Sequence, residues 1–411
     1  MTSLPIKKLN ILFLSHRVPY PPNKGEKIRT FNQIKYLSEQ GHTVFVCSPI
    51  EQEADIQHLK TLAQKYSVTT SGAKGAGVFK LFKGLLKNQA LSIANFYSKH
   101  VQDEIDKTIN NNNFDAIICS SSSMAEYVFN SEAIAFDRRS RPKLIMDFMD
   151  LDSDKWSQYQ RLKPFPLSLI YKREAKLLFK YEQRIHREFD ACLFISQAEV
   201  DLFHQKDTDL GKVYVVANGL DTNFFKPCIN KKPSPESQPV LLFTGVMDYF
   251  PNIDAVEWFI KQTWRDIKKS YPNATFIIAG MNPTSKVLAL AKNDGVIVTG
   301  FVDDIRDYYN KADIFIAPFQ IARGVQNKVL QAFACGLPVI GTSIAFEGID
   351  CQDKEEALTA NTPADFLSNL TRLMEDKELK ETIGQNALEL VSKRYSWEGC
   401  LKQLDRLLFS E

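Results

Sequence analysis

Short apolar runs alternate with amphipathic stretches of helical period along most of the chain. In the first half, the runs expected as buried strands span 9–14, 43–47, 115–119, 143–146, 191–195 and 213–217. In the second half they span 240–244, 274–279, 296–299, 313–317 and 338–341. A helix is expected over 27–39, because its apolar positions recur at helical spacing and Gly41 follows it. Strands that alternate with helices predict an α/β fold with parallel, doubly wound sheets.

The segment 226–239 separates the two series of strands. It holds four prolines and four charged side chains, which is typical of an interdomain linker. We therefore expect a Rossmann-like domain over 1–225, a second one over 240–395 and a C-terminal helix over 396–411. Whether that helix packs back on the first domain stays open. Two such domains predict a central cleft, with ligands bound beyond the carboxyl ends of the strands.

Composition and charge narrow the class of protein. Of the 411 residues, 44% are apolar and 24% are charged, as in globular proteins. A net charge of +2 argues against a nucleic-acid-binding protein. Residues 1–220 carry 30 basic and 24 acidic side chains, whereas residues 221–411 carry 21 and 25. The first half is therefore the better candidate for contact with an anionic surface.

The cysteines and the apolar run lengths indicate the cellular compartment. Seven cysteines, none in a Cys-x2-Cys pair, support neither a disulfide framework nor a zinc site. The N-terminal apolar run is too short for a signal peptide, and no run is long enough to cross a membrane. We expect a cytoplasmic protein that is either free or peripheral on the inner face of the cytoplasmic membrane.

Two stretches carry a resemblance to a known family. They are Val216-Ala-Asn-Gly-Leu-Asp221, followed by Phe225-Lys-Pro227, and the segment from Arg323 through Gly336-Leu-Pro-Val-Ile340. With the other loops in order, they resemble the retaining glycosyltransferases of family 4, also called group 1, which have the GT-B fold. Within that family the chain is similar to sugar transferases of exopolysaccharide and PEP-CTERM/exosortase systems. The resemblance covers nearly the whole chain.

The resemblance implies a reaction and its partners. The second domain would bind a nucleotide-diphosphate sugar, UDP- or GDP-linked, and the first would bind a glycan acceptor, expected to be lipid-linked. Transfer would retain the anomeric configuration and use neither a metal ion nor a cofactor. Asp150-x-Asp152 also spells the metal-binding signature of the other glycosyltransferase fold, but that fold has a single domain, and the doubled organisation here argues against it.

The donor half departs from the family at its hallmark. The family's two glutamates, eight positions apart, fall on Arg323 and Gln331. Gly324, Lys328 and Gln331 share one face of a predicted helix, whose N-terminus with an arginine and a lysine favours a diphosphate. We therefore expect Arg323 and Lys328 to stabilise the leaving diphosphate. The alternative is that both are solvated surface cations.

Other donor contacts follow from the resemblance or from loop position. These candidate residues are Gly245, Asp248, Gly280, Gly300, Phe301, Val302, Gly324, Asn327 and Gln331. The glycines would let strand-to-helix turns pass close to a bound ligand. Asp248 either bonds a sugar hydroxyl or caps the helix that begins near Pro251.

The acceptor half offers fewer candidates. Lys24 and Gly25 stand where the family has a glycine pair; a tight turn is the alternative. Asp150 follows the strand over 143–146, where relatives have a histidine, and its carboxylate could orient or deprotonate an acceptor hydroxyl. Asp152 and Asp154 fit a helix N-terminus instead.

Two neighbouring segments are less specific. Residues 71–77 are glycine-rich without the pattern of a phosphate loop, and we expect a hinge there. Residues 78–87 form a predicted amphipathic helix with lysines on one side. That helix is either an ordinary surface helix or a contact with an anionic membrane.

Two other functions stay open at this point. A nucleotide-sugar epimerase of the same fold would turn over a sugar nucleotide without an acceptor. A degenerate protein that binds a nucleotide sugar or glycan without catalysis is the second alternative, and it is motivated by Arg323 and Gln331.

Overall fold

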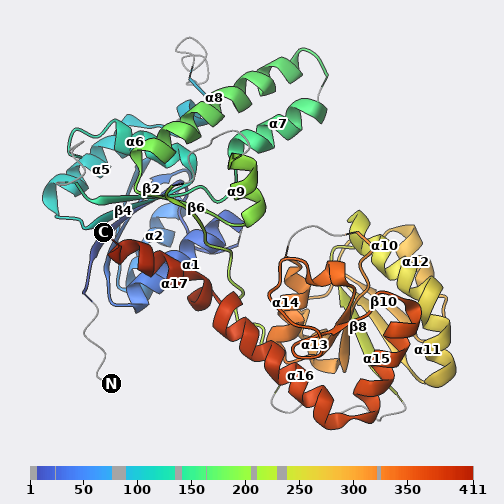
Figure 1. Ribbon diagram of the computed structural model, residues 1–411. Coiled ribbons are helices and arrows are strands. Elements are labelled where there is room, and N and C mark those ends of the chain that lie inside the picture. Colours follow the sequence, from blue (N-terminus) through green and yellow to red (C-terminus); the bar gives the residue numbers. More distant parts are fainter. Residues whose placement is uncertain are drawn as a thin grey trace. The chain divides into compact units, whose positions relative to one another are not determined.

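A computed structural model shows two compact units, which are described separately (Figure 1). The structure describes residues 7–23, 25–75, 89–134, 141–162, 164–204, 211–228, 238–321 and 325–410. The first unit comprises Met1–Asn218 with Leu401–Glu411, and the second comprises Gly219–Cys400. The boundary thus falls before the segment 219–225, because Phe225 is buried in the core of the second unit, with its ring 5.9 Å from that of Tyr309.

The first unit is built on a seven-stranded parallel sheet in the order β3-β2-β1-β4-β5-β6-β7. Its strands are β1 (Asn10–Ser15), β2 (Thr43–Ile50), β3 (Thr69–Lys74), β4 (Ala116–Ser120), β5 (Lys143–Asp147), β6 (Ala191–Phe194) and β7 (Val213–Val215). Its helices are α1 (Gly25–Glu39), α2 (Ala54–Tyr66), α4 (Leu91–Phe96), α5 (Lys99–Asn111), η2 (Ser122–Met124), α6 (Ala125–Phe129), α7 (Asp152–Leu162), α8 (Leu167–Glu188) and α9 (Gln197–His204).

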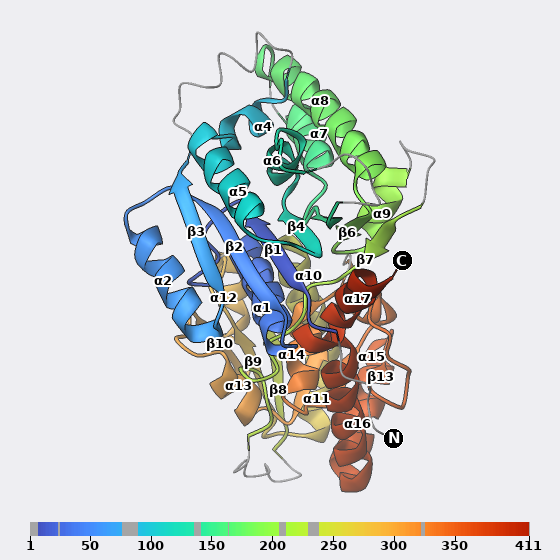
Figure 2. The same cartoon turned by 90° about the vertical axis from the view of Figure 1, so that its left-hand side faces the viewer.

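Helices cover both faces of this sheet, which explains the apolar runs. Figures 1 and 2 show α5, α6 and α8 on one face and α1 and α2 on the other. All five residues of β4 are buried, because a central parallel strand has no face in water. The expected runs at 9–14, 43–47, 115–119, 143–146, 191–195 and 213–217 each coincide with a strand.

The glycine-rich segment 71–77 is not a hinge where the structure describes it. Ser71–Lys74 belong to the edge strand β3, which pairs with β2 so that Gly72 lies opposite Ser48. A Cβ on Gly72 would lie 2.7 Å from the Ser48 carbonyl oxygen. Glycine is therefore needed for the close approach of two strands. The predicted amphipathic helix over 78–87 lies outside the described residues.

The second unit repeats the plan with a six-stranded parallel sheet in the order β10-β9-β8-β11-β12-β13. Its strands are β8 (Val240–Thr244), β9 (Thr275–Ala279), β10 (Val296–Gly300), β11 (Ile314–Ala317), β12 (Val339–Gly341) and β13 (Leu358–Thr359). Its helices are α10 (Phe250–Phe259), η3 (Ile260–Trp264), α11 (Arg265–Ser270), α12 (Ser285–Leu290), α13 (Arg306–Lys311), α14 (Asn327–Ala334), η4 (Ser343–Phe346), α15 (Pro363–Glu375), α16 (Lys377–Leu390) and η5 (Val391–Tyr395).

The last helix, α17 (Trp397–Phe409), passes from the second unit to the first. In the first unit, the Tyr36 hydroxyl on α1 donates to Asp405 Oδ2 at 2.7 Å. Leu401, Leu404 and Leu407 of α17 are buried. The chain end is therefore an integral part of the first unit. Within the part of the chain that the structure describes, no helix is both long and apolar enough to span a bilayer.

A buried ion pair fixes α1 to the carboxyl end of β5 in the first unit. Arg29 Nε and Nη2 donate to the two carboxylate oxygens of Asp147 at 2.7 and 3.0 Å, and Gln33 Nε2 donates to the same carboxylate at 2.6 Å. Arg29 Nη1 also donates to Asn218 Oδ1. Both charged groups are almost fully buried, so removal of either one would leave an uncompensated charge. The pair thereby holds the start of the loop that carries Asp150.

We predict that Gly72→Ala destabilises the first unit by about 1–3 kcal/mol, because the new methyl group overpacks against the β2 backbone. Gly75→Ala is the matched control, since its Cβ would meet nothing closer than 3.5 Å. Urea unfolding followed by circular dichroism measures both variants. Equal stability of the two would show that β3 moves aside without cost.

Candidate functional site

A cavity of about 550 Å³ lies at the carboxyl ends of β8, β9 and β10 in the second unit. The strand order reverses between β8 and β11, and an open parallel sheet binds its ligands at such a switch point. The cavity is lined by Thr244, Gly245, Val246, Tyr249, Asn252, Ala279, Gly280, Met281, Phe301, Val302, Ile305, Asn327, Lys328 and Gln331. Strand ends, the loops after them and the start of α14 thus converge on one space.

Two glycines bring the ends of β8 and β9 into contact. Gly280 has a φ of +146°, and a Cβ on it would lie 1.8 Å from the Gly245 carbonyl oxygen. A Cβ on Gly245 would in turn lie 2.7 Å from Asn252 Nδ2. Neither position has room for a side chain, so the packing of the two strand ends requires glycine at both positions that line the cavity here.

Lys328, the second residue of α14, supplies a cation to this cavity. Its ammonium donates to Asn252 Oδ1 at 2.7 Å and lies 4.8 Å and 5.4 Å from the ring centres of Phe319 and Phe243. Burial lowers the pKa of Lys328 from 10.5 to about 8. In the described part of the chain, no carboxylate lies within ion-pair distance of this ammonium. The group is therefore a partly desolvated cation without a protein anion.

Gln331 is oriented by a buried hydroxyl network. The Tyr309 hydroxyl donates to Gln331 Oε1 at 3.0 Å and lies 2.8 Å from Thr244 Oγ1. Tyr309 is fully buried, which raises its pKa and keeps it a neutral donor. Gln331 lines the cavity, and its amide NH2 is a hydrogen-bond donor group.

The structure brings together most of the predicted donor residues. Gly245, Gly280, Phe301, Val302, Asn327, Lys328 and Gln331 all line the cavity. Gly300 lies next to it, with a φ of +69° and its amide oxygen bonded to Gly280 N at 3.3 Å. Arg323 and Gly324 lie outside the described residues, so their predicted roles stay predictions.

Asp248 is not among the residues that line the cavity. Its carboxylate accepts a hydrogen bond from Asn282 Nδ2 at 3.1 Å at the surface. The alternative, that Asp248 caps a helix, is wrong, because α10 begins at Phe250 and its N-cap is Tyr249.

Sequence reasoning missed Thr244, Asn252 and Tyr309. Thr244 ends the apolar run of β8, whereas Asn252 and Tyr309 lie within α10 and α13, where no local pattern marks them.

A smaller cavity, of about 280 Å³, lies at the corresponding switch point of the first unit, between β1 and β4. It is lined by His16, Glu26, Arg29, Ser121, Phe148, Met149, Asp150, Asp152, Lys155, Ile195 and Asn218. Asp150 is exposed at its rim and follows Met149, whose φ is +63°. Gly25 is the first residue of α1, and Lys24 lies outside the described residues.

Three titratable groups around Asp150 were not predicted as site residues. Burial, reinforced by Arg17, lowers the pKa of His16 to about 4, so its imidazole is neutral at pH 7. Burial raises the pKa of Glu199 to about 7, and this carboxylate accepts from the backbone N–H groups of Leu151 and Ile195 at 3.2 Å. Burial also raises the pKa of Asp152, which accepts from Ser122 Oγ.

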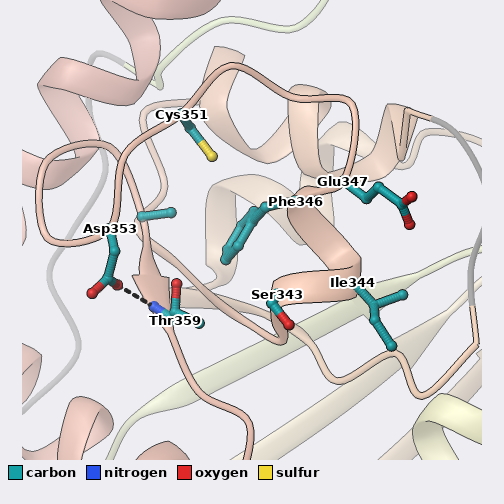
Figure 3. Close-up of a pocket in the computed structure, with 8 residues that line it drawn as sticks. Ser343, Ile344, Phe346, Glu347, Cys351, Asp353 and Thr359 are labelled. Atoms are coloured by element: carbon teal, nitrogen blue, oxygen red, sulfur yellow. Dashed lines mark hydrogen bonds between the residues drawn. The ribbon is translucent and has the colours of Figure 1, made fainter.

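A third cavity, of about 420 Å³, lies in the second unit after β12 and is shown in Figure 3. Glu347 and Asp353 are among its lining residues, and Asp353 accepts a hydrogen bond from the Thr359 N–H at 2.6 Å. Burial raises the pKa of Cys351 to about 11, so its thiol is not a nucleophile at pH 7. Carboxylates without a lining cation disfavour an anionic ligand, which distinguishes this cavity from that at Lys328.

The comparison with solved structures identifies the fold. Anabaena HepE in complex with UDP and glucose matches with a TM-score of 0.56 at 16% identity, over 98% of this chain and all of that one. WaaG, described as a glycosyltransferase involved in lipopolysaccharide biosynthesis, matches with a TM-score of 0.52 over 97% of this chain. The two parallel-sheet α/β units are those of the GT-B glycosyltransferase fold.

The sequence comparisons identify a family domain in the second unit. Residues 238–376 match the model described as "Glycosyl transferases group 1", so the chain carries a domain of that family. The Klebsiella pneumoniae protein named "Uncharacterized 44.6 kDa protein in cps region" is 23% identical, over 94% of this chain and 96% of its own. The Escherichia coli UDP-Gal:alpha-D-GlcNAc-diphosphoundecaprenol alpha-1,3-galactosyltransferase is 26% identical, over 52% of this chain and 59% of its own.

We predict that Lys328→Met stabilises the second unit by about 1–3 kcal/mol at pH 7, because methionine suits the Phe243 and Phe319 rings without a buried charge. A folded-state pKa near 8, below the unfolded value of 10.5, makes the unfolded chain bind more protons between these values. Wild-type stability therefore rises over that range, and the advantage of the variant shrinks. Thermal unfolding at several pH values measures this difference.

Lys311→Met on α13 is the matched control for this measurement, because Lys311 is exposed. Its effect should stay within about 0.5 kcal/mol and should not change with pH. A Lys328→Met variant that is less stable than wild type at pH 7 would show that the ammonium is satisfied by the protein itself.

Proposed function

We propose that the chain transfers a sugar from a UDP- or GDP-linked donor, bound in the Lys328 cavity, to a glycan acceptor at the first unit. The observation that carries this proposal is the Lys328 ammonium, which is partly buried at a switch point and lacks an anion in the described part of the protein. A diphosphate supplies that anion. The reaction would belong to the synthesis of a bacterial exopolysaccharide or cell-surface polysaccharide.

The geometry of the donor cavity supports a nucleotide diphosphate. Lys328 would face the diphosphate, whose charge grows as the glycosidic bond breaks, so the cation stabilises the transition state more than the ground state. The Gln331 amide would donate to the ribose. The exposed Phe301 ring would pack against the base. Structures of the HepE neighbour with UDP and with UDP-glucose support a uridine nucleotide. Arg323 is proposed as a second cation at the same diphosphate.

The acceptor side of the proposal rests on Asp150 and on two relatives. Asp150 stands at the rim of the switch-point cavity in the first unit, where its exposed carboxylate can accept a hydrogen bond from an acceptor hydroxyl. The E. coli relative is named for a diphosphoundecaprenol-linked acceptor, and the Klebsiella relative for the cps region. The E. coli name supports a lipid-linked glycan acceptor for this chain.

The proposed reaction retains the anomeric configuration and needs no protein nucleophile. The bond from the anomeric carbon to the leaving phosphate oxygen breaks, and the acceptor oxygen bonds to the same carbon on the same face. The acceptor proton passes to the departing phosphate oxygen. Asp150 orients the acceptor hydroxyl during this step, in contrast to the paired carboxylates of glycosidases. We also propose that the chain belongs to family 4 and, within it, to the PEP-CTERM-associated members.

The lining of the donor cavity favours a transferase over an epimerase. An epimerase needs an acid and a base beside the sugar. Among the described residues that line this cavity, the titratable groups are Lys328 and Tyr249, and neither a carboxylate nor an imidazole is present to act as the base. An experiment distinguishes a transferase from a protein that binds a nucleotide sugar without catalysis. The non-catalytic protein would bind nucleotide but would release no nucleoside diphosphate in the presence of lipid-linked glycans.

We predict that UDP or GDP binds the wild-type chain and that Lys328→Met weakens this binding at least tenfold, because a charge-assisted hydrogen bond is lost. Ligand at 100 times its dissociation constant should stabilise the protein by about 2.7 kcal/mol in a thermal-shift panel that includes ADP and dTDP. Wild-type affinity should fall above pH 8, as Lys328 loses its proton, and should level off near the affinity of Lys328→Met. Titration calorimetry measures both effects.

The control for the binding experiment is again Lys311→Met, which should bind like wild type. The pH dependence above 8 should also vanish in Lys328→Met, because no titrating cation remains at that position. If Lys328→Met bound UDP and GDP as tightly as wild type does, the diphosphate assignment would be wrong.

We predict that Asp150→Asn lowers kcat for sugar transfer by about 100-fold or more while the affinity for the nucleotide stays unchanged, because the amide cannot hold an acceptor hydroxyl as the carboxylate does. Asp201→Asn on α9, an exposed residue whose carboxylate accepts a hydrogen bond from Gln197, is the matched control. Release of nucleoside diphosphate in the presence of extracted lipid-linked glycans is the measurement. Normal kcat in Asp150→Asn would remove this residue from the reaction.

A further inference from the structure

The α7–α8 hairpin of the first unit carries an exposed apolar tip. Both views show the two helices projecting beyond the other helices of that unit (Figures 1 and 2). At the turn, Phe165 is 77% exposed and Leu169 is 56% exposed; Leu167 and Ile170 are also exposed. Behind the tip, the rings of Trp156 and Tyr171 pack at 5.2 Å between centres and join the helices. The tip side chains therefore face solvent on a structured element.

A row of cations runs along α8 away from this tip. Lys172, Lys176 and Lys180 are exposed and four residues apart, so they form one stripe on the helix. Each precedes by two residues a position that is buried, namely Glu174, Leu178 or Glu182. Two residues correspond to about 200° of helical rotation, so the lysine stripe lies opposite the buried face.

The acidic residues of α8 do not neutralise this stripe. Glu174 is buried, and its carboxylate accepts from the N–H groups of Leu91 and Ser92 at 2.8 Å, at the start of α4. Glu182 is fully buried and accepts from Ser153 N at 3.0 Å. Where the structure describes side chains, no carboxylate lies within ion-pair distance of the three lysines. The outer face of the hairpin therefore presents apolar groups at its end and positive charge along its side.

We infer that the α7–α8 hairpin docks on an anionic membrane surface, with the apolar tip inserted at the headgroup boundary and the lysine stripe against lipid phosphates. Apolar insertion and basic charge together give the two signals that stable peripheral binding requires. A symmetric contact between two copies would place stripe against stripe and repel. The inference goes beyond the proposed function, because membrane binding is measured without donor, acceptor or transfer.

Co-sedimentation of the full chain with vesicles tests the docking. The chain should bind vesicles of phosphatidylcholine mixed with phosphatidylglycerol, and should bind pure phosphatidylcholine at least tenfold more weakly. Phe165→Ser/Leu169→Ser and Lys172→Gln/Lys176→Gln/Lys180→Gln should each weaken binding to the anionic vesicles at least tenfold, since each lysine near the surface contributes about fivefold. All these positions are exposed, and unchanged unfolding midpoints confirm the fold of the variants.

Matched controls come from exposed residues of the second unit. Leu288→Ser removes an apolar side chain that is 51% exposed, and Lys261→Gln/Lys286→Gln/Lys292→Gln removes three exposed charges. Both should bind vesicles like wild type. A third variant, Lys80→Gln/Lys83→Gln/Lys87→Gln, tests the predicted amphipathic segment separately.

Three results would overturn the inference. The wild-type chain could fail to bind anionic vesicles. The two hairpin variants could bind as well as wild type while the Lys80/Lys83/Lys87 variant loses binding. Light scattering could also show a dimer that Phe165→Ser/Leu169→Ser dissociates, without vesicle binding by wild type; the tip would then be an interface between copies of this chain.

Discussion

A lysine ammonium that is partly removed from water and has no protein anion in the described structure is the constraint on which the cavity of the second unit depends. Lys328 is kept in place by Asn252, whose amide nitrogen is itself anchored on the Val246 carbonyl at 2.9 Å. Asn252 fits there only because Gly245 has no side chain. The backbone of Gly280 in turn packs against the Gly245 carbonyl group, which leaves no room for a Cβ on Gly280. Desolvation makes the charged form of Lys328 unfavourable in the free protein, and a bound anionic ligand would compensate for this.

The two units use the same sheet order but treat their buried cations in opposite ways. In the first unit, Arg29 is neutralised by Asp147 within the protein, and the pair serves to position a loop. In the second unit, Lys328 is left with a neutral partner. The two switch points therefore differ in spite of the shared strand order. In the first unit the cavity is polar and has the Asp150 carboxylate at its rim, whereas in the second unit the cavity favours an anion. This division matches the separate acceptor and donor roles that are proposed.

Prediction from the sequence succeeded where the signal is local and failed where it is not. Every apolar run expected as a strand is a strand, because parallel strands with both faces covered must be apolar throughout. The edge strand β3 has the sequence Thr-Thr-Ser-Gly-Ala-Lys and was missed, since half-exposed polar residues give no such pattern. The helix-cap alternative for Asp248 was wrong, because α10 begins two residues later and its N-cap is Tyr249.

The sequence by itself determined the class of fold, the two-unit organisation and half of the residues that line the Lys328 cavity, because apolar periodicity, glycines and loop position are properties of short segments. Only the tertiary structure decided which polar groups meet. Lys328 and Asn252 are 76 residues apart and Arg29 and Asp147 are 118 apart, and no local pattern specifies such pairs. The lowered pKa of Lys328 likewise arises from burial that the folded unit creates.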